Sequence, residues 1–476
     1  MTALWTSQEI AAATGGTCTG AWTASGISID TRTVQNGDLF VALKGPTFDG
    51  HEFVGAALKA GAAGVLVHQP VSDLDSDNSH TRAVVVKDTF AALENLGRAA
   101  RARTEAKIVA VTGSVGKTST KEALRAALSA QGPTSATLGN LTNHWGVPVS
   151  LARMPRESAF GVFELGMNHP GEIAPLSKQV RPHVAVITAV EAVHLENFDS
   201  VEGIAHEKAA IMAGLEPGGT VALPRDSAHY DTLVKAAHGY GAKIVSFGAD
   251  DGTSDALLVS WTLTPSGTQV AADIGGHRHT YEIGAHGRHW ALNSVAVLAA
   301  VHALGADVGR AAAAFANLTA PIGRGARREV HGPNGAFTLI DESYNGSPAS
   351  VRAMAEMVGA MGIDHGRRIL ALGDMLELGA AAGDLHAGLA DSLRTAGIDL
   401  VFTAGPLMER LHDALPREMR AGHAKDAASL VPLITGAMRD GDVVAVKGSN
   451  GSRMSVVVKA LGALDPAPGP RAANGH

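Results

Sequence analysis

Cysteine is almost missing from this chain, since Cys18 is the only one among 476 residues. A single cysteine excludes internal disulfides and cysteine-based metal sites, and it is typical of a reducing compartment. Long hydrophobic runs are missing as well: the most apolar stretch, residues 291–306, contains Asn293 and His302 and is too short to span a membrane. The first residues have neither the basic nor the apolar region of a signal peptide. These absences predict a soluble, cytoplasmic protein without a membrane span, in which residues 291–306 form a buried helix.

Positive charge is also in deficit. The 39 Lys and Arg residues are outnumbered by 46 Asp and Glu residues, which gives a formal net charge of -7, and no basic block occurs. An acidic chain of this kind is a poor candidate for binding nucleic acid. Any anionic ligand must therefore be bound by a local site and not by a long-range field.

The length exceeds what one hydrophobic core normally supports, so several domains are expected. Apolar residues make up 45% and charged residues 18%, an ordinary globular composition. We predict an α/β protein with three domains, residues 1–104, 105–320 and 321–464, followed by a disordered Pro- and Gly-rich tail at 465–476. The polar run at 72–81 is expected to be a surface loop.

Short strands and helices alternate along all three parts. Helices are expected at 7–13, where Thr6 and Glu9 have capping-box spacing, at 52–60, and from Asp88 or Thr89 to about 103. Strands are expected at 26–30, 38–43, 64–67 and 83–86, then at 108–111, 160–165, 184–188, 220–223 and 244–247, and finally at 337–340, 369–372, 400–403 and 443–446. Continuous apolar strands that alternate with helices indicate a mostly parallel, doubly wound sheet in the middle part. In such sheets ligands bind beyond the carboxyl ends of the strands.

A glycine-rich segment follows the strand at 108–111 and opens a helix. Backbone amides of such a loop turn toward phosphate, and the helix N-terminus adds a positive field. The full phosphate-loop pattern has glycine where this chain has Val111, so the motif is the shortened form, and glycine-rich turns also occur for purely structural reasons. We predict that the loop binds ATP, with Lys117 on the β- and γ-phosphates and Thr118 on Mg²⁺. The predicted phosphate-binding residues are Gly113, Ser114, Val115, Gly116, Lys117, Thr118 and Ser119.

This loop resembles that of the Mur ligases and folylpolyglutamate synthases. Four further segments match that family in the expected order, at 140–148, 164–167, 194–208 and 287–293, and the resemblance extends from about residue 27 to 453. It implies an ATP-dependent ligase with two Mg²⁺ ions. In that reaction a substrate carboxylate attacks the γ-phosphate to give an acyl phosphate, and an amine then displaces phosphate. Two anions must approach each other, so cations must surround them.

The resemblance also implies roles for single residues. Glu164 and His194 would bind the metals, and Lys208 would be carbamylated by CO₂ so that its new negative charge supports the second Mg²⁺. Without the resemblance, Glu164 would be a surface or capping carboxylate, His194 a structural histidine and Lys208 a solvated lysine. Three more residues are implied at the nucleotide: Asn293 near the adenine, Arg324 on the phosphates, and Asp341 near the ribose and the hinge. Trp290 departs from the family, which often has asparagine there.

The first domain resembles the uridine-nucleotide domain of the family members that add the third residue or the dipeptide. The alternative interpretation is a tight turn between strands, which fits the glycines better than it fits Arg32. The residues that the resemblance assigns to the UDP-muramoyl substrate are Ser28, Thr31, Arg32, Lys44, Gly45, Asp49, Thr142 and Asn143.

The last domain separates these two enzymes. Residues 341–348, residues 373–379 with His386, and residues 447–453 resemble the branch that adds D-alanyl-D-alanine, although Glu342, Gly346 and Ser347 depart from its pattern. Tyr344, Asn345 and Ser347 would lie near the amine substrate. The expected reaction joins D-alanyl-D-alanine to a UDP-N-acetylmuramoyl-tripeptide, a cytoplasmic step of peptidoglycan synthesis, and we expect a monomer.

Three alternatives stay open. A sister ligase would add diaminopimelate or lysine to the precursor, or glutamate to folate. A P-loop ATPase or kinase would turn over ATP without forming an amide. A protein that only binds the UDP-muramoyl peptide is the third, against which stands the presence of Lys117, Glu164, His194 and Lys208.

Overall fold

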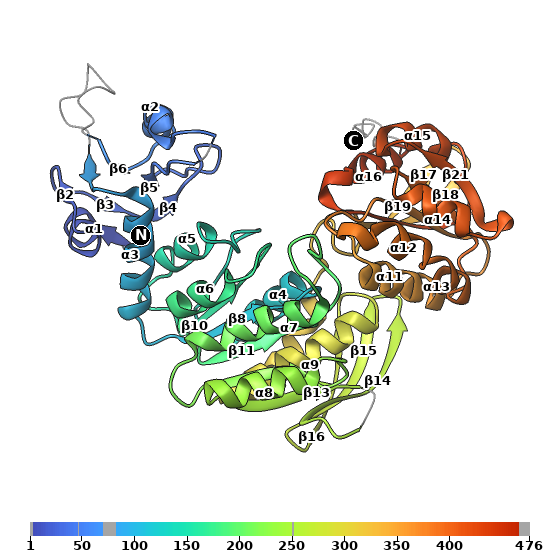
Figure 1. Cartoon of the computed structure of the whole chain (residues 1–476), viewed down its shortest axis with the longest axis horizontal. Helices are drawn as coiled ribbons and strands as arrows, with labels where there is room; N and C mark the ends of the chain where they lie inside the picture. The colour runs from blue at the N-terminus through green and yellow to red at the C-terminus, as the bar shows by residue number, and fades with distance from the viewer. Residues whose placement is uncertain (1–2, 46, 70–81, 250–251, 466–476) are drawn as a thin grey trace, which may run out of the picture.

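The computed structural model describes residues 3–45, 47–69, 82–249 and 252–465. The predicted loop at 72–81 and all but the first residue of the predicted tail lie outside these ranges. Figure 1 shows three lobes in an open V, with the N-terminal lobe (residues 3–104) and the C-terminal lobe (321–465) at opposite ends of the central lobe (105–320). Each lobe contains one main sheet, and the predicted α/β fold is confirmed. The boundaries between the lobes stay predictions.

The N-terminal lobe is built on a sheet with the strand order β2-β7-β6-β5-β4, parallel except for β2. Its elements are β1 (Trp5–Thr6), α1 (Ser7–Thr14), β2 (Thr17–Cys18), β3 (Thr23–Ala24), β4 (Gly26–Ser28), β5 (Asp38–Val41), η1 (Gly50–Phe53), α2 (Val54–Lys59), β6 (Gly64–Val67), β7 (Ala83–Val85) and α3 (Thr89–Ala102). The predicted caps are confirmed: Thr6 and Glu9 form a capping box, and Asp88 accepts the amides of Phe90 and Ala91. The helix predicted at 52–60 is confirmed as α2, although it begins at Val54, because Asp49 caps a 3₁₀ turn that precedes it.

The central lobe contains a sheet whose order, among the described residues, is β16-β15-β14-β13-β12-β11-β8-β10-β9. Its elements are β8 (Lys107–Thr112), α4 (Lys117–Ser129), β9 (Thr134–Ala136), α5 (Gly146–Ala152), β10 (Phe160–Glu164), α6 (Ile173–Val180), β11 (Val184–Ile187), α7 (Val201–Ala209), η3 (Ala210–Gly214), β12 (Thr220–Pro224), α8 (Tyr230–Tyr240), β13 (Lys243–Gly248), β14 (Ala256–Thr264), β15 (Gly267–Ile274), β16 (His277–Ile283), α9 (Arg288–Ala303), α10 (Val308–Ala314) and η4 (Phe315–Asn317). The pairs from β9 to β14 are parallel, as the apolar strands predicted.

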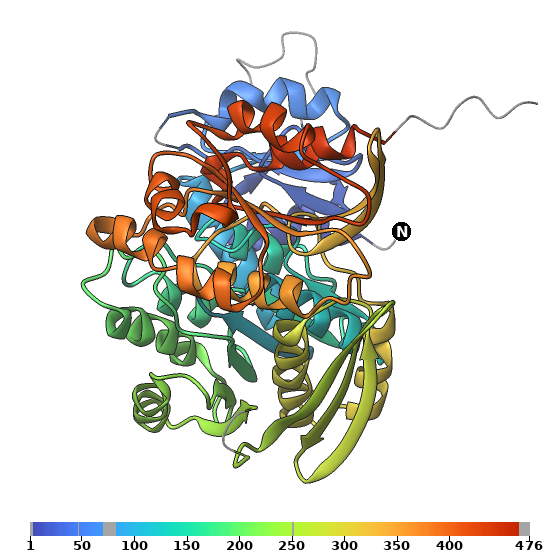
Figure 2. The same ribbon diagram turned by 90° about the vertical axis from the view of Figure 1, so that its right-hand side faces the viewer.

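Strands β14, β15 and β16 extend this sheet in a way that the sequence did not predict. The pairs β14–β15 and β15–β16 are antiparallel, and Figure 2 shows these strands as a long ribbon at one edge of the molecule. Buried and exposed residues are mixed along all three strands, so they lack the continuous apolar run that marks the parallel strands.

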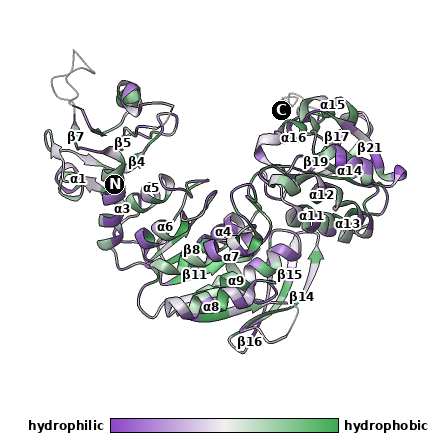
Figure 3. Cartoon of the chain, viewed as in Figure 1, coloured by the Kyte–Doolittle hydropathy of each residue, from purple (hydrophilic) through white to green (hydrophobic). Residues whose placement is uncertain are grey.

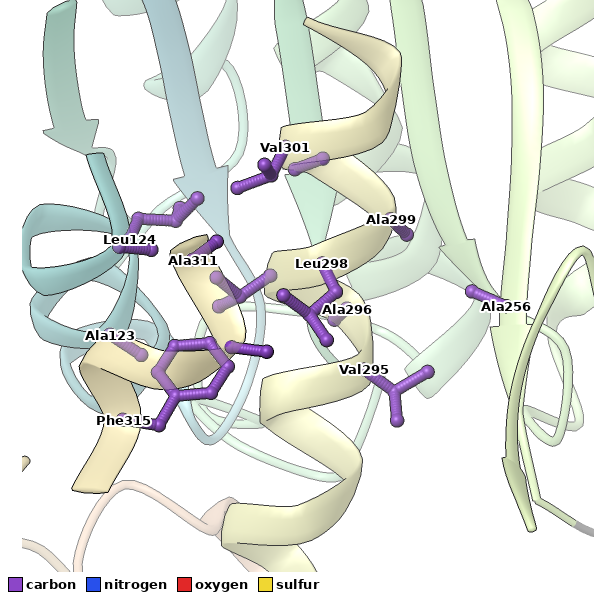
Figure 4. Close-up of a cluster of buried hydrophobic side chains, with 14 of the residues drawn as sticks. Ala123, Leu124, Ala256, Val295, Ala296, Leu298, Ala299, Val301, Ala311 and Phe315 are labelled. Carbon is purple, nitrogen blue, oxygen red and sulfur yellow. The ribbon is translucent and has the colours of Figure 1, made fainter. Parts of the chain in front are cut away.

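Helix α9 fills the core on one side of the central sheet. It confirms the buried helix expected at 291–306, and ten of its residues are buried, among them Val295, Leu298 and Val301. Figure 4 shows Leu124 of α4 and Phe315 of η4 on one side of α9, and Val295 on the other side, toward Ala256 of β14. Figure 3 shows the hydrophobic colour concentrated on the central strands and α9. Within the described ranges, every helix is too short or too polar to cross a membrane.

The C-terminal lobe contains a sheet of order β17-β18-β22-β19-β20-β21, parallel except for the β17–β18 pair. Its elements are β17 (Ala326–Gly332), β18 (Gly335–Glu342), α11 (Pro348–Ala360), β19 (Arg368–Gly373), η5 (Gly379–Ala381), α12 (Ala382–Ala387), α13 (Ala390–Thr395), β20 (Leu400–Ala404), α14 (Met408–Ala414), η6 (Arg417–Met419), β21 (Arg420–Ala424), α15 (Ala427–Thr435), β22 (Val443–Lys447), η7 (Asn450–Ser452) and α16 (Ser455–Gly462).

Candidate active site

The predicted phosphate loop lies between the end of β8 and the start of α4. Gly116 precedes the helix with φ of 84°, a conformation that glycine adopts readily, and a Cβ at Gly113 would collide with Thr188 Oγ1. The loop is also tied to the segment after β11, because Ser114 N donates to Ala189 O at 2.8 Å and Ser114 Oγ donates to Glu191 O at 3.1 Å. These contacts hold the loop in the shape that the sequence predicted, at the carboxyl end of a parallel strand.

Lys117 folds back over this loop. Its Nζ donates to Gly113 O at 2.7 Å and to Ser114 O at 3.3 Å. Burial lowers the pKa of Lys117, the nearby Glu164 raises it, and the nearby Arg324 lowers it. The ammonium group therefore lies close to a carboxylate and to a second cation, where an anionic phosphate would relieve the repulsion between the two positive charges.

Glu164 lies at the end of β10, beside β8. Its Oε1 accepts a hydrogen bond from Thr118 Oγ1 at 3.0 Å, while the buried Oε2 has no hydrogen-bond partner. Buried carboxylate oxygens are costly without a partner, and oxygen ligands are those that Mg²⁺ prefers. A hydroxyl beside an unpartnered carboxylate oxygen fits a Mg²⁺ ion, so Thr118 and Glu164 could hold one together.

His194 is in the loop that follows β11. It has a left-handed backbone with φ of 53°, and its Nδ1 lies in contact with the Glu377 carboxylate from the C-terminal lobe. Burial lowers the pKa of His194, Glu377 raises it, and Lys117 and Lys208 lower it further. These effects place His194 within reach of both lysine charges.

Lys208 is buried in helix α7, with 1% of its surface exposed, so the alternative of a solvated lysine is wrong. Burial is the first reason why its pKa lies well below the ordinary value, and Lys117 is the second. A buried lysine of this kind carries a neutral amine more readily, and only the neutral amine reacts with CO₂. The preceding Glu207 caps helix α6 through the amides of Gly171 and Ile173, which fixes α7 in place.

Arg324 and Asp341 lie at the connection between the central and C-terminal lobes. The Arg324 guanidinium stacks on the ring of Tyr344 at 4.2 Å from its centroid, and its charge acts on Lys117. Asp341 accepts from Gly323 N at 3.1 Å and from Ser343 Oγ at 2.6 Å. Asp341, at the end of β18, thereby holds the turn that contains Arg324.

Asn293 lies on α9 beside the phosphate loop. Its side-chain amide is so close to Gly116 that a Cβ there would be 3.1 Å from both Asn293 Nδ2 and Oδ1. Trp290, three residues earlier on α9, is buried in the core of the central lobe.

The residues predicted for the UDP-muramoyl substrate lie in three segments. Ser28 is buried and bonds to Asp30 O and Thr33 Oγ1, and Arg32 extends outward, with 86% of its side chain exposed, in an ion pair with Asp30. Lys44 and Asp49 form a β-bridge that closes the loop around Gly45. Thr31 is half-buried on the turn that carries Arg32.

Thr142 and Asn143 belong to the central lobe but come close to that loop. The Phe48 ring meets the Trp145 ring edge-on at 6.1 Å between centroids, which joins the loop at 44–49 to the segment at 140–145. Thr142 O accepts from Gly166 N at 2.9 Å, two residues after Glu164. Asn143 caps the turn into α5 by accepting from Trp145 N and Gly146 N. The predicted substrate residues thus lie in segments that connect the N-terminal lobe with the end of β10, next to the phosphate loop.

The predicted amine residues lie just before helix α11. Tyr344 is half-buried under Arg324, and Asn345 is exposed. Ser347 is buried and caps α11 by accepting from Ser350 N at 3.3 Å, so its hydroxyl already has a structural role. All of these substrate assignments stay predictions.

Two features of the site had no role in the sequence analysis. Glu377 was part of a quoted segment, yet nothing in the chain linked it to His194. Glu342, noted only as a departure, forms a buried ion pair with Lys447 at 3.1 Å, beside His289. The two pairs join residues that are 105 and 183 positions apart, so spacing along the sequence does not predict either contact.

A cluster of Asp49, His51 and His68 lies in the N-terminal lobe, with one ligand atom of each within 4.8 Å of the others. His51 Nδ1 contacts Asp49 Oδ1 at 2.7 Å, and His51 Nε2 accepts from His68 N at 3.0 Å. Because both ring nitrogens of His51 already have partners, the cluster is a structural link between η1 and the end of β6.

Three successive ranges match models of one family. Residues 23–104 match the Mur ligase family, catalytic domain; residues 111–301 match the Mur ligase middle domain; and residues 326–450 match the Mur ligase, glutamate ligase domain. A UDP-N-acetylmuramoyl-tripeptide--D-alanyl-D-alanine ligase from Escherichia coli (strain K12) is 34% identical over 92% of this chain and 94% of its own.

Solved structures agree with this similarity. MurF from Acinetobacter baumannii has a TM-score of 0.82 and 29% identity, over 96% of this chain and 98% of that one. MurF ligase from Thermotoga maritima in complex with ADP has a TM-score of 0.76 and 25% identity, over 92% of this chain and 97% of that one. The matches extend over all three lobes, and this chain belongs to the Mur ligase family, as its sequence predicted.

Proposed function

We propose that this protein is an ATP-dependent ligase that joins D-alanyl-D-alanine to a UDP-N-acetylmuramoyl-tripeptide, a step in the synthesis of peptidoglycan precursors. The similarity to D-alanyl-D-alanine ligases of this type covers more than nine-tenths of the chain. The last lobe carries the residues 341–348 and 373–379 that the sequence assigned to this branch.

One observation supports the chemistry most directly. Glu164 ends β10, while Lys117 and His194 follow the neighbouring parallel strands β8 and β11, and the charge of Lys117 acts on both Glu164 and His194. A cation for phosphate, an unpartnered carboxylate oxygen and a histidine therefore converge where ligands bind in such sheets.

The reaction would proceed in two steps. A carboxylate oxygen of the tripeptide attacks the γ-phosphorus of ATP, which breaks the bond to the β-phosphate oxygen and releases ADP. The amine of D-alanyl-D-alanine then attacks the acyl carbon, the phosphate leaves, and the amine loses a proton as the amide forms. Lys117 and Arg324 would stabilise negative charge on the transferring phosphoryl group, a role supported by the proximity of the two cations at the phosphate loop.

Thr118 and Glu164 would hold one Mg²⁺, and His194 with carbamylated Lys208 would support a second. The ions would neutralise charge between the phosphates and the incoming carboxylate. Asn293 and Asp341 would lie at the nucleoside, and Ser28, Thr31, Arg32, Lys44, Gly45, Asp49, Thr142 and Asn143 at the UDP-muramoyl substrate. Tyr344 and Asn345 would lie at the amine, together with Ser347 in its capping position.

Phosphate release from Mg²⁺-ATP tests this function. With UDP-N-acetylmuramoyl-tripeptide present, release should require D-alanyl-D-alanine and should yield a pentapeptide product by mass spectrometry. Release that instead requires a free amino acid and a shorter precursor would identify a sister ligase. ATP turnover that ignores both substrates would contradict ligation.

The carbamate on Lys208 needs a separate test. Lys208→Ala should abolish ligation while the circular dichroism spectrum stays that of the original protein. Short carboxylates such as formate should restore part of the activity, because they replace the missing negative charge near the second Mg²⁺. Full activity of this variant without any addition would refute the role of Lys208.

We also propose that the protein acts as a monomer in the cytoplasm. The single Cys18 and the nucleotide-linked substrates fit that compartment. Sedimentation of the purified chain at several concentrations would test the monomer.

A further inference from the structure

We infer that Glu377 of the C-terminal lobe is a positioning residue for His194: it holds Nδ1 of the ring so that Nε2 faces the second Mg²⁺. The inference rests on the metal role of His194 in the proposed function. It adds that this metal site is complete only while the C-terminal lobe lies against the central lobe.

The contact between the two side chains is direct. His194 Nδ1 is buried and lies against Glu377 Oε2 in an ion-pair contact, and no well-directed hydrogen bond joins this nitrogen to Glu377 or to any other described residue. The side chain of His194 is 20% exposed and that of Glu377 is 46% exposed. Glu377 therefore keeps part of its hydration, which limits the cost of bringing its charge to the ring.

Both His194 and Glu377 have an uncommon backbone conformation at this contact. His194 has φ of 53° and Glu377 has φ of 65°, left-handed values that are uncommon for residues other than glycine. Glu196 N donates to Glu377 O at 3.4 Å, so the two turns also meet through their main chains. Uncommon backbone conformations persist where the surroundings hold them, and they concentrate at functional sites.

The chemistry of histidine gives this contact a consequence. A histidine that binds a metal through one ring nitrogen almost always donates the N–H of the other to a carboxylate, a carbonyl or water. That donation fixes the tautomer, and here it would leave the lone pair of Nε2 for the ion. Because the two partners belong to different lobes, the ring is correctly held only when the amine-binding lobe is in place.

The opposite reading is that Glu377 pulls His194 away from the ion and blocks the site. The two alternatives predict opposite changes in metal affinity when Glu377 is removed. If Glu377 positions the ring, its removal weakens metal binding; if Glu377 blocks the site, its removal strengthens metal binding.

The experiment measures Mn²⁺ binding to the full chain by electron paramagnetic resonance, with β,γ-methylene-ATP present. Two Mn²⁺ ions should bind, one more weakly than the other. Glu377→Ala and His194→Asn should each lower the affinity of the weaker site by about 10- to 100-fold, the usual effect of losing such a partner or its ligand. The double variant should lose no more than His194→Asn alone. Glu409→Ala removes an exposed carboxylate from α14 of the same lobe and should leave binding unchanged.

A spectroscopic measurement separates positioning from general structural damage. In protein labelled with ¹⁵N-histidine, the His194 signals are those that disappear in His194→Asn. They should report a proton on Nδ1 in the original protein and a mixture of tautomers in Glu377→Ala. Thermal melting of each variant shows whether the fold is kept, and Glu377→Gln serves as a second variant that preserves the shape of the side chain.

If Glu377→Ala binds Mn²⁺ within two-fold of the original affinity while His194→Asn loses that affinity, the inference about Glu377 is overturned. The metal role of His194 would then still stand. Stronger binding in Glu377→Ala would overturn the inference in favour of blocking. Unchanged binding in His194→Asn would overturn both this inference and the metal role of His194, while leaving the ligase reaction to its own assay.

Discussion

At the scale of single residues, Glu164 has a buried carboxylate oxygen that lowers the stability of the folded protein. One of its oxygens is bonded to Thr118 Oγ1, and the other is buried without a hydrogen bond. Such an oxygen costs about 1–3 kcal/mol, or more because it is charged. The nearby Lys117 offsets part of this cost through its positive charge, and a bound cation would offset the rest.

We predict that Glu164→Gln lowers the activity without lowering the thermal stability. The amide can still accept from Thr118 but offers no charge to Mg²⁺, so kcat should fall by about 100- to 1000-fold, as for loss of a group that stabilises charge. The midpoint of thermal unfolding without ligands should change little, since the loss of attraction to Lys117 offsets the relief of the unpartnered buried oxygen. An unchanged Mg²⁺ dependence of the rate would contradict the role of Glu164.

At the scale of elements, helix α11 begins at the predicted amine site. Its N-cap is Ser347, whose hydroxyl bonds to the first turn, and the capping box is completed by Ser350. Tyr344 and Asn345 lie just before this cap, so the start of the helix fixes where their segment ends.

We predict that Ser347→Ala lowers the free energy of unfolding by about 1 kcal/mol, the usual effect of losing an N-cap. If capping is its main role, KM for D-alanyl-D-alanine should change little. Ser347→Thr keeps a capping hydroxyl and serves as the control in urea unfolding. A large rise in KM with unchanged stability would instead place the hydroxyl on the substrate.

His386 connects helix α12 to the loop after β19. Its Nε2 accepts from Met375 N at 3.0 Å and its Nδ1 bonds to Ala382 O at 2.6 Å. Burial lowers the pKa of His386, and the Ala382 carbonyl and Asp374 raise it by less. The folded protein therefore holds the neutral ring at pH values where the unfolded chain would already be protonated.

Protonation of His386 in the unfolded chain makes the folded protein less stable in acid. Stability from His386 is present above about pH 6.5, the ordinary value of a histidine, and it is lost as the pH falls toward the lower pKa of the folded state. His386→Gln does not titrate, so the midpoint of thermal unfolding should fall less between pH 7 and pH 5 than in the original protein. Parallel curves for the two proteins would show that His386 contributes nothing to acid sensitivity.

At the scale of the whole molecule, the two outer lobes are attached differently. The N-terminal lobe is fastened to the central one by buried contacts: Trp5 Nε1 donates to Ala152 O at 2.8 Å, and Arg101 donates to Val180 O and Arg181 O, both at 2.8 Å, and pairs with Glu216. The C-terminal lobe meets the central lobe through the Arg324 turn and the partly exposed contact of Glu377 with His194. Movement between lobes is therefore expected at the C-terminal connection.

We predict that Arg101→Ala lowers the free energy of unfolding by about 2–3 kcal/mol, because the carbonyl oxygens of Val180 and Arg181 lose their donor, while Glu216 keeps its ion pair with Arg181. Arg98→Ala is the matched control on the same helix. Arg98 is 51% exposed and pairs with Glu94 four residues earlier, an arrangement that contributes only about 0.3–0.5 kcal/mol. Equal effects of the two substitutions in urea unfolding would mean that the lobes are not fastened by Arg101.

The sequence predicted those parts of the molecule that depend on neighbours along the chain. The phosphate loop at 113–119, the caps at Thr6 and Asp88, and the parallel strands of the central sheet follow from local spacing and continuous apolar runs. The family could be predicted for the same reason, since its motifs are short and occur in a fixed order.

Only the tertiary structure decided the rest. Lys208 looks like a solvated lysine by itself, and its burial and lowered pKa arise from segments that pack around α7. Glu377 meets His194 across 183 residues of chain, and β14–β16 mix buried with exposed positions. Burial, charge and contact between distant segments depend on how the whole chain packs, and no local pattern of residues encodes them.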